Sequence, residues 1–552
     1  MLKFILVLCI FCSASLSQAK KNNKVVVKET QQELSYGSSQ ATAGGTLTMN
    51  LIGEPPTIHP ITSMDLSALN VHDWTMGSLL VKDPRTFEWK PSVAERWETS
   101  KDGKIFTFWL RQGVTFHDGR PLTAEDVKFS FDAIFDPQYK AASRIPYFEN
   151  IAKVEVLDSH QVKFYAKDSY FLNFDVAAGM FILPKHVYGD VEKSKKMNKE
   201  LVGCGPYKLE IFDRGNKIVL KKYKDWLGTE LPAFRGFYNF ETIQFRFAKE
   251  ENIYMEMLNR GDLDYQELSP EEYSKKTEGG NWGKTVNKFK VENALAKGYR
   301  YVSWNLDNNL FKDKNVRKAL AYLMNREEMN QKFRFGLSIL ATGPTDVFSD
   351  YASPAVKPLA FDVAKAQALL AQAGWKDSDK DGVLDKMING KKTDFRFALI
   401  HSNKDYEKYL TMYKEELKKN GIDMEVKYLE WNSFLKNIDA GKFEAMSMAW
   451  TTSIDFDPKP EWHSSSAVSG GSNFIHYKVH EVDQLIDQAR LELDRTKRIQ
   501  MLRKVYERIA NDYPYVFMFN EKYSLYALST RVGQVAPTFK YSLGLDSWWV
   551  KP

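Results

Sequence analysis

Cysteine is scarce in this chain of 552 residues, which contains three. Cys9 and Cys12 lie in segment 1–19, which has Lys3 near its start, an apolar run at 4–11 and Ser-Gln-Ala at its end. These features predict a cleavable secretory signal. Neither cysteine follows the small residue that a lipoprotein signal requires, which favours a protein without a lipid anchor. Cys204 is then left without a partner, so we expect no internal disulfide in the exported chain.

Long apolar runs and a strong net charge are also missing. After residue 19 no stretch is long and apolar enough to cross a bilayer. The net charge is +6, with 77 Lys and Arg interleaved with 71 Asp and Glu. No basic stripe with interspersed aromatic residues is present, so nucleic acid is not expected as a partner. Hydrophobic residues make up 43% and aromatic residues 14%, which excludes global disorder and suffices for several large cores.

Motifs of common catalytic sites are absent from the sequence. There is no Gly-x-Ser-x-Gly, no His-Glu-x-x-His and no glycine-rich phosphate loop. We therefore expect neither an enzyme nor a bound cofactor. A secreted hydrolase would have to build its site from scattered residues, and it ranks last among the functions considered.

The N-terminal half shows the signals of a mixed α/β protein. Residues 20–44 are polar and aperiodic, which predicts a disordered tail. A strand is expected at Gly45–Leu51 and a helix at Leu66–Leu80. Asp102-Gly103 predicts a hairpin turn, and Thr123 to Asp126 predicts the capped start of a helix.

The C-terminal half alternates strands and helices. Asp313 and Asp362 are placed to cap helices, and Gly374 is placed to end the second of these. The order strand, helix, strand predicts an α/β sheet with parallel pairing. The elements expected here are strands at 395–400, 424–428 and 515–520 and helices at 406–420, 482–490 and 495–511.

The stretch 443–466, FEAMSMAWTTSIDFDPKPEWHSSS, is the best candidate for a binding site. Ala445–Trp450 has the length and apolar character of a buried strand, and hydroxyl and carboxylate groups follow it directly. Open α/β sheets usually bind ligands at the ends of strands, and a buried carboxylate there needs a partner such as a cationic ligand group. An ordinary strand exit with solvated aspartates is the alternative interpretation. The candidate ligand-binding residues are Trp450, Thr451, Thr452, Ser453, Asp455, Asp457 and Trp462.

Several separate motifs resemble those of the family 5 extracellular solute-binding proteins, the peptide- and nickel-binding receptors of ABC importers. The resemblance extends from about residue 45 to the C-terminus, and its motifs follow the family order. The segments that carry it are 92–134, Leu201–Lys208 (LVGCGPYK), Tyr301–Glu328, Ala371–Trp375, Gly421–Asp423 and Phe443–Trp450.

The resemblance implies the α/β fold of a two-lobed periplasmic binding protein (type II, cluster C-like), with an additional domain inserted in one lobe. Strand crossings near residues 293 and 519 would join the lobes and favour hinge closure around a ligand. The expected domains are a discontinuous domain I at 45–80, 199–293 and 519–552, domain II at 81–198, and domain III at 294–518.

The resemblance also implies a function. The chain would be a periplasmic receptor, expected to be monomeric, that captures short peptides between its lobes and delivers them to an inner-membrane ABC permease. A nickel chelate, haem or an oligosaccharide are the alternative ligands, with His463, His476 and His480 as the clustered histidines. In peptide-binding relatives an aspartate shortly after a Trp-Thr pair binds the peptide ammonium. The spacing differs here, so Asp455 is the candidate anchor and Asp457 is expected to stabilise the loop.

An aspartate-rich segment resembles the start of a calcium loop. Asp377, Asp379 and Asp381 alternate ahead of Gly382, as oxygen ligands and a turn glycine do in such loops. Position twelve, where a bidentate glutamate is expected, is Ile388. The three aspartates are therefore candidate calcium ligands without a complete motif.

Overall fold

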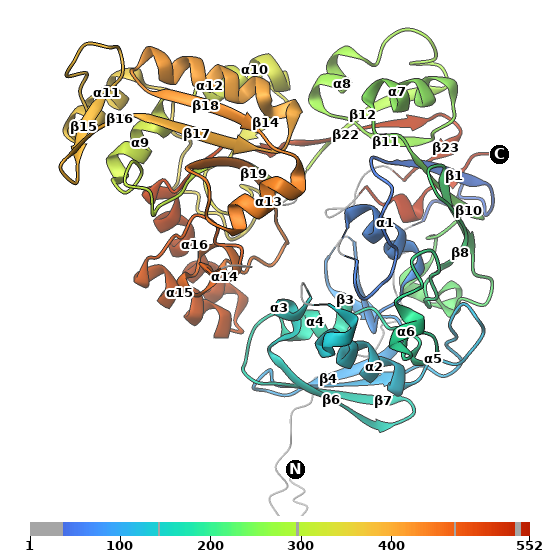
Figure 1. Cartoon of the computed structure of the whole chain (residues 1–552). Coiled ribbons are helices and arrows are strands. Elements are labelled where there is room, and N and C mark those ends of the chain that lie inside the picture. The colour runs from blue at the N-terminus through green and yellow to red at the C-terminus, as the bar shows by residue number, and fades with distance from the viewer. Residues whose placement is uncertain are drawn as a thin grey trace, which may run out of the picture.

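The computed structural model describes residues 37–63, 65–84, 86–141, 144–293, 297–468, 471–535 and 543–552. The predicted signal and the tail up to residue 36 lie outside the described residues. The chain forms two lobes that face each other, with the C-terminal half of the chain in the lobe on the left of Figure 1. The lobe on the right extends downward into a subdomain built from residues that follow α1 (Leu66–Thr75).

A seven-stranded sheet forms the centre of the right-hand lobe. Its strand order is β12-β22-β11-β1-β10-β9-β8, so it combines segments from three distant parts of the chain. β1 pairs in parallel with β10 and β11, while β22 pairs antiparallel with β11 and β12. The strands are β1 (Thr46–Leu51), β8 (Tyr207–Asp213), β9 (Lys217–Lys222), β10 (Thr242–Phe247), β11 (Tyr265–Glu267), β12 (Val286–Glu292) and β22 (Tyr523–Ser529).

The lower subdomain contains a four-stranded antiparallel sheet in the order β4-β5-β7-β6. The predicted hairpin is confirmed, because Asp102-Gly103 joins β4 to β5 and Gly103 has a φ of +65°. The predicted cap is confirmed as well: Thr123 and Asp126 form a capping box at the start of α2. The elements are β4 (Ala94–Thr99), β5 (Ile105–Leu110), β6 (Ile151–Asp158), β7 (Gln161–Ala166) and α2 (Ala124–Phe135).

The left-hand lobe is built on a five-stranded sheet in the order β18-β17-β19-β13-β20. The predicted strand, helix, strand unit is confirmed, because β17 and β18 are parallel and α12 connects them. Asp313 and Asp362 cap α9 and α11 as expected. The elements are β13 (Gly298–Trp304), β17 (Arg396–His401), β18 (Asp423–Tyr428), β19 (Ala445–Thr451), β20 (Tyr515–Phe517), α9 (Lys314–Tyr322), α11 (Val363–Gln372) and α12 (Glu407–Lys419).

Short strand pairs and further helices complete the structure. The pairs are β2 (Leu80–Lys82) with β3 (Trp89–Pro91), β14 (Ser338–Leu340) with β21 (Phe519–Glu521), β15 (Asp385–Ile388) with β16 (Lys391–Asp394), and β23 (Val532–Gly533) with β24 (Trp549–Val550). The helices are α3 (Ile145–Phe148), α4 (Asn173–Gly179), α5 (Lys185–Tyr188), α6 (Val191–Ser194), α7 (Glu251–Arg260), α8 (Pro270–Lys275), α10 (Arg326–Arg334), α13 (Trp431–Asp439), α14 (Lys459–Trp462), α15 (His480–Leu491) and α16 (Arg495–Asp512).

The chain passes between the seven-stranded and five-stranded sheets twice. One passage lies between β12 and β13, and the other lies between β20 and β22. Asn520 in the second passage donates a hydrogen bond to the carbonyl of Gly298, 2.8 Å away. The buried carboxylate of Asp346 accepts a hydrogen bond from the backbone N–H of Lys297. The bond from Asn520 to Gly298 links the two passages directly, while the exact domain limits stay a prediction.

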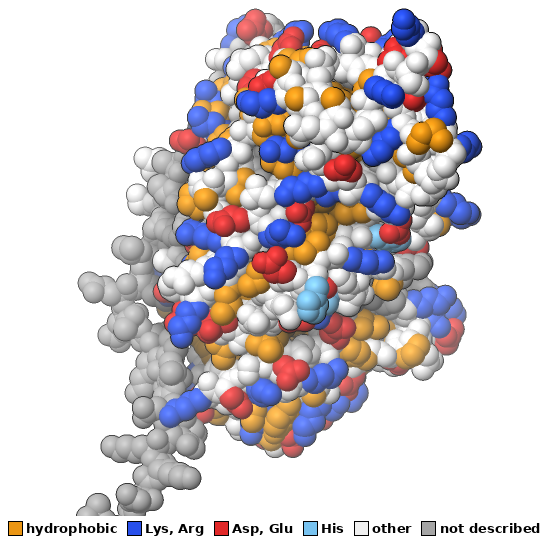
Figure 2. Space-filling view, turned by 90° about the vertical axis from the view of Figure 1, so that its left-hand side faces the viewer, with side chains coloured by type: hydrophobic (Ala, Val, Ile, Leu, Met, Phe, Trp, Pro, Cys, Tyr) orange, Lys and Arg blue, Asp and Glu red, His pale blue; other side chains and the backbone are white. Residues whose placement is uncertain are grey.

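Charged side chains of both signs lie on the surface, and the lone cysteine of the described part is buried. On the face shown in Figure 2, Lys and Arg side chains are interspersed with Asp and Glu. None of the helices in the described ranges combines the length and apolar character needed to span a bilayer. Cys204, the sole cysteine of the described part, is buried, and burial raises the pKa of its thiol to about 12.

His72 gives the right-hand lobe a predictable acid sensitivity. The imidazole is buried in α1 and its Nε2 bonds the carbonyl of Ile58 at 2.9 Å. Burial, with a smaller contribution from Arg144, lowers the pKa of His72 from 6.5 to about 4. Between these values the unfolded chain binds more protons, so the free energy of unfolding falls as the pH drops.

We expect His72→Gln to remove this part of the pH dependence. Gln can still donate to Ile58, but it does not titrate. From pH 7 to pH 4.5 the wild type should lose about 2.5 kcal/mol more unfolding free energy than the variant. Urea unfolding of both proteins at the two pH values measures the difference. Equal losses in both proteins would contradict this role of His72.

Candidate functional site

β19 lies inside the five-stranded sheet and forms the first part of the predicted binding stretch 443–466. It pairs antiparallel with β13 and in parallel with β17. Trp450, near its end, is half-buried between the ring of Tyr301, at a centroid distance of 6.4 Å, and the ring of Phe474, at 5.9 Å. Thr451 and Ser453 are exposed, and Thr452 is half-buried. The strand therefore delivers an indole and three hydroxyls to its end, as the sequence suggested.

Asp455 lies where the left-hand lobe meets the lower subdomain. Its carboxylate accepts a hydrogen bond from the phenol of Tyr351 at 3.0 Å and lies 4.0 Å from Nζ of Lys82 in β2. Lys82 also forms an ion pair of 2.6 Å with Asp175 in α4. Asp455 thus belongs to a network of charges that joins two parts of the chain. Its role as the peptide anchor stays a prediction.

Asp457 accepts hydrogen bonds in a second contact between the left-hand lobe and the lower subdomain. Its Oδ2 accepts a hydrogen bond from the phenol of Tyr170 at 2.7 Å and one from Nε of Arg490 in α15 at 3.0 Å. Its Oδ1 accepts from the backbone N–H of Lys459 at 3.1 Å, at the start of α14. Burial, together with the charge of Asp457, raises the pKa of the Tyr170 phenol. Asp457 therefore fixes both its own loop and the approach of Tyr170.

Trp462 has no solvent-exposed surface in the structure. Its ring packs against Tyr515, with a centroid distance of 4.7 Å, and edge-on against Tyr477, at 5.7 Å. Glu461, the residue before it in α14, is half-buried. Sequence reasoning did not select Tyr351 or Lys82, because nothing near them in the sequence indicates what they face.

The three clustered histidines do not gather around one point. His463 lies 3.3 Å from a carboxylate oxygen of Asp487, and His476 contacts Asp307 at 2.5 Å. His480 is the first residue of α15. His463 and His476 therefore contact different carboxylates, those of Asp487 and Asp307.

The aspartate-rich segment brings together a slightly different set of residues from the expected one. Side-chain oxygens of Asp377, Asp379 and Asp385 lie within 4.8 Å of one another, which makes them the one such acidic group in the described ranges. Asp381 instead forms an ion pair of 3.3 Å with Arg396. Lys392 already pairs with Asp379, so a cation would have to compete with it. Calcium binding at this segment stays a prediction.

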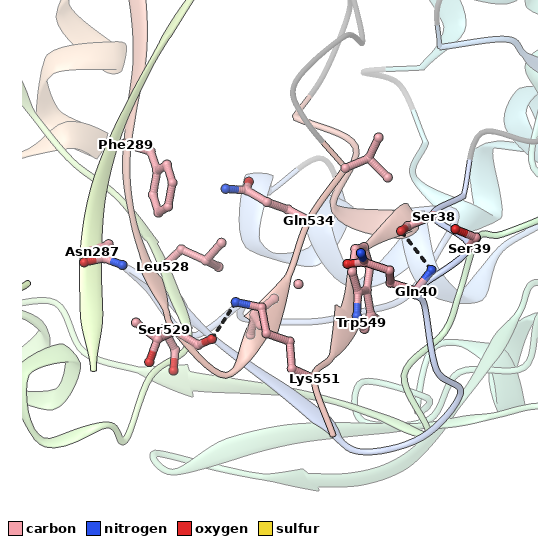
Figure 3. Close-up of a pocket in the computed structure, with 14 residues that line it drawn as sticks. Ser38, Ser39, Gln40, Asn287, Phe289, Leu528, Ser529, Gln534, Trp549 and Lys551 are labelled. Carbon is pink, nitrogen blue, oxygen red and sulfur yellow. Dashed lines mark hydrogen bonds between the residues drawn. The ribbon is translucent and has the colours of Figure 1, made fainter. Parts of the chain in front are cut away.

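A cavity of about 520 Å³ lies elsewhere, beside the chain termini of the described part. In the close-up of Figure 3, Phe289 and Leu528 line one side, and Trp549 and Gln40 line another. It shares no residue with the stretch 443–466. The sequence-based candidates and this cavity are therefore two separate features.

Comparison with known proteins decides the family. Residues 88–473 match the family model described as bacterial extracellular solute-binding proteins, family 5. The chain belongs to this family. The resemblance found in the sequence motifs and the expected two-lobed α/β fold are thereby confirmed, and the family is one of exported proteins that bind solutes.

Known proteins are similar to this chain over most or all of its length. It is 30% identical to the oligopeptide-binding protein AppA of Bacillus subtilis (strain 168), over all of this chain and 98% of AppA. The dipeptide-binding protein of Escherichia coli (strain K12) is 25% identical and covers 76% of this chain and 78% of its own.

Solved structures of other proteins have the same fold as this chain. The structure of Bacillus subtilis AppA in complex with a nonapeptide has a TM-score of 0.77, an identity of 28%, and covers 92% of this chain and 99% of its own. NikZ from Campylobacter jejuni, in complex with Ni(L-His), has a TM-score of 0.75 at 23% identity and covers 93% of this chain and 100% of its own.

Proposed function

We propose that this family 5 receptor captures short peptides in the periplasm and delivers them to an ABC permease in the inner membrane. The observation that carries the proposal is the end of β19. There an indole and hydroxyls stand beside the carboxylate of Asp455, which lies 4.0 Å from Nζ of Lys82 in the opposite part of the chain. The similarity to AppA, an oligopeptide-binding protein whose structure holds a nonapeptide, supports peptides as the ligand class.

The proposed mechanism is closure of two lobes around the peptide by a monomeric protein. Domain I would comprise residues 45–80, 199–293 and 519–552, domain II residues 81–198, and domain III residues 294–518. The two passages between the sheets are the natural place for bending, since few residues connect the lobes there. A peptide that contacts both lobes favours the closed form by its differential affinity for that form.

The proposal is tested by identifying what the protein binds. We expect the mature protein, purified without unfolding, to carry a mixture of short peptides visible by native mass spectrometry. Asp455→Asn should retain fewer of them if Asp455 contributes the anchor, since a charge-assisted bond is roughly twice as strong as a neutral one. Glu481→Gln, which changes an exposed carboxylate on α15, is the matched control.

The outcomes separate the alternatives. If Asp455→Asn carries as much peptide as the wild type, the receptor function stands and Asp455 is not the anchor. A stoichiometric metal complex, haem or sugar in place of peptides would contradict the proposed ligand class. Catalytic consumption of a peptide would contradict a pure receptor.

A further inference from the structure

The second passage between the lobes is a single residue long. β21 ends at Glu521 and pairs with β14 of the left-hand lobe, whereas β22 begins at Tyr523 in the seven-stranded sheet. Lys522 alone therefore separates an element of one lobe from an element of the other. The passage lies near the top of Figure 1, where β22 runs toward the left-hand lobe. A change in the angle between the lobes must be absorbed by the backbone of Lys522 and its immediate neighbours.

Both passages are fixed to the left-hand lobe at one end. The buried carboxylate of Asp346 accepts hydrogen bonds from the backbone N–H groups of Lys297 and Gly298, at 3.1 and 3.4 Å. In the second passage, Glu521 accepts a hydrogen bond of 2.6 Å from the buried guanidinium of Arg334 in α10. Lys297, Gly298 and Glu521 therefore belong to the left-hand lobe through their contacts.

Three side chains connect these fixed ends to the right-hand lobe. Nζ of Lys297 donates a hydrogen bond to the hydroxyl of Ser524 in β22, 2.7 Å away. This hydroxyl donates to Oδ1 of Asn293 at 2.6 Å, and Nδ2 of Asn293 donates to the carbonyl of Glu521 at 2.8 Å. Ser524 and Asn293 are both buried. The side chains of Lys297, Ser524 and Asn293 are called the hinge relay below.

The three hydrogen bonds of the hinge relay run in one direction. Each side chain that accepts a bond donates the next one, from the ammonium of Lys297 to the carbonyl of Glu521. Hydrogen bonds in such a chain polarise one another, and the positive charge at its start strengthens the first of them. The relay begins and ends on residues of the left-hand lobe, while Ser524 and Asn293 adjoin strands of the right-hand lobe. It therefore ties the lobes together at the place where their angle is set.

We propose that the hinge relay holds the angle between the two lobes in the form seen here, with Lys297 as its positioning residue. The backbone N–H of Lys297 is bonded to Asp346 on one side of the hinge, while its ammonium is bonded to Ser524 on the other. A rotation of the lobes about Lys522 moves Ser524 relative to Asp346 and stretches the relay at its charged end. The inference rests on the proposed closure of the lobes and is independent of the identity of the ligand.

The variant Lys297→Met tests the proposal, because it removes the ammonium and keeps the backbone bond to Asp346. We expect the equilibrium of the unliganded protein to move about 10- to 100-fold toward open forms, the factor that corresponds to a hydrogen bond from a charged donor. Small-angle scattering of the mature protein after exhaustive dialysis should show this as a larger radius of gyration. Lys297→Arg retains a charged donor and should restore the wild-type scattering curve.

A double-mutant cycle shows whether Lys297 acts through the relay. In Ser524→Ala the ammonium of Lys297 has lost its acceptor, so adding Lys297→Met should change the scattering curve little further. Lys442→Met removes an exposed ammonium of the left-hand lobe and is the matched control, which should scatter like the wild type. Circular dichroism establishes that each variant is folded.

The outcomes keep this inference apart from the proposed function. A wild-type radius of gyration in Lys297→Met, or an undiminished effect of this change in the Ser524→Ala background, would overturn the role of the relay. The receptor function would still stand, since native mass spectrometry tests peptide binding separately. Wild-type protein that carries no peptide would contradict the proposed function and leave the scattering comparison valid.

Discussion

Replacing Trp462 with alanine is expected to lower the free energy of unfolding by about 3 to 5 kcal/mol. The side chain is fully buried and packs against Tyr477, Tyr515 and Phe517. Truncation removes this apolar contact and leaves a cavity that the surrounding sheet and helices cannot close completely. Urea unfolding followed by near-UV circular dichroism measures the loss.

Trp431→Ala is the matched control. Trp431 lies at the start of α13 and is 49% exposed, so its truncation should cost less than about 1 kcal/mol. A second variant, Trp462→Phe, tests whether Trp462 contacts ligand. Peptide affinity equal to that of the wild type would place Trp462 in the core alone, whereas a selective loss of affinity at unchanged stability would make it part of the binding surface.

Tyr170→Phe is expected to shift the unliganded protein toward an open form. The phenol donates to Asp457 across the contact between the lower subdomain and the left-hand lobe. A hydrogen bond to a charged group contributes about 1.5 to 3 kcal/mol, which corresponds to a factor of roughly 10 to 100 in the equilibrium between open and closed forms. Small-angle scattering should show a larger radius of gyration, and peptide dissociation constants should rise.

The same measurements on Tyr147→Phe give the reference, because Tyr147 is 62% exposed. Identical scattering curves and dissociation constants for Tyr170→Phe and the wild type would show that this bond does not hold the lobes together. A change in scattering without a change in affinity would separate the closure of the free protein from the closure around a ligand.

The sequence predicted the elements that carry their own local signals. Asp102-Gly103, the Thr123 cap and the apolar strand after residue 444 each identify their element within a few residues. Boundaries set by distant contacts were less accurate. The helix expected to reach Leu80 ends at Thr75, and the expected strand 515–520 is split, because Met518 bonds to Arg300 while β21 turns to pair with β14.

The candidate site was predictable as a location and not as a set of contacts. The strand end and its carboxylates followed from the local pattern, and family motifs gave the fold. Tyr351, the partner of Asp455, is 104 residues away in the sequence, and Lys82 belongs to another sheet.

The low reactivity of Cys204 allows the opening and closing of this receptor to be followed with dyes attached to engineered cysteines. Because the thiol is buried and its pKa is about 12, it should be almost inert toward maleimides at neutral pH. One engineered cysteine on each lobe can therefore carry a pair of fluorescent dyes without replacing the native residue. The energy transfer between the dyes would then report, molecule by molecule, how the distance between the lobes changes when peptide is added.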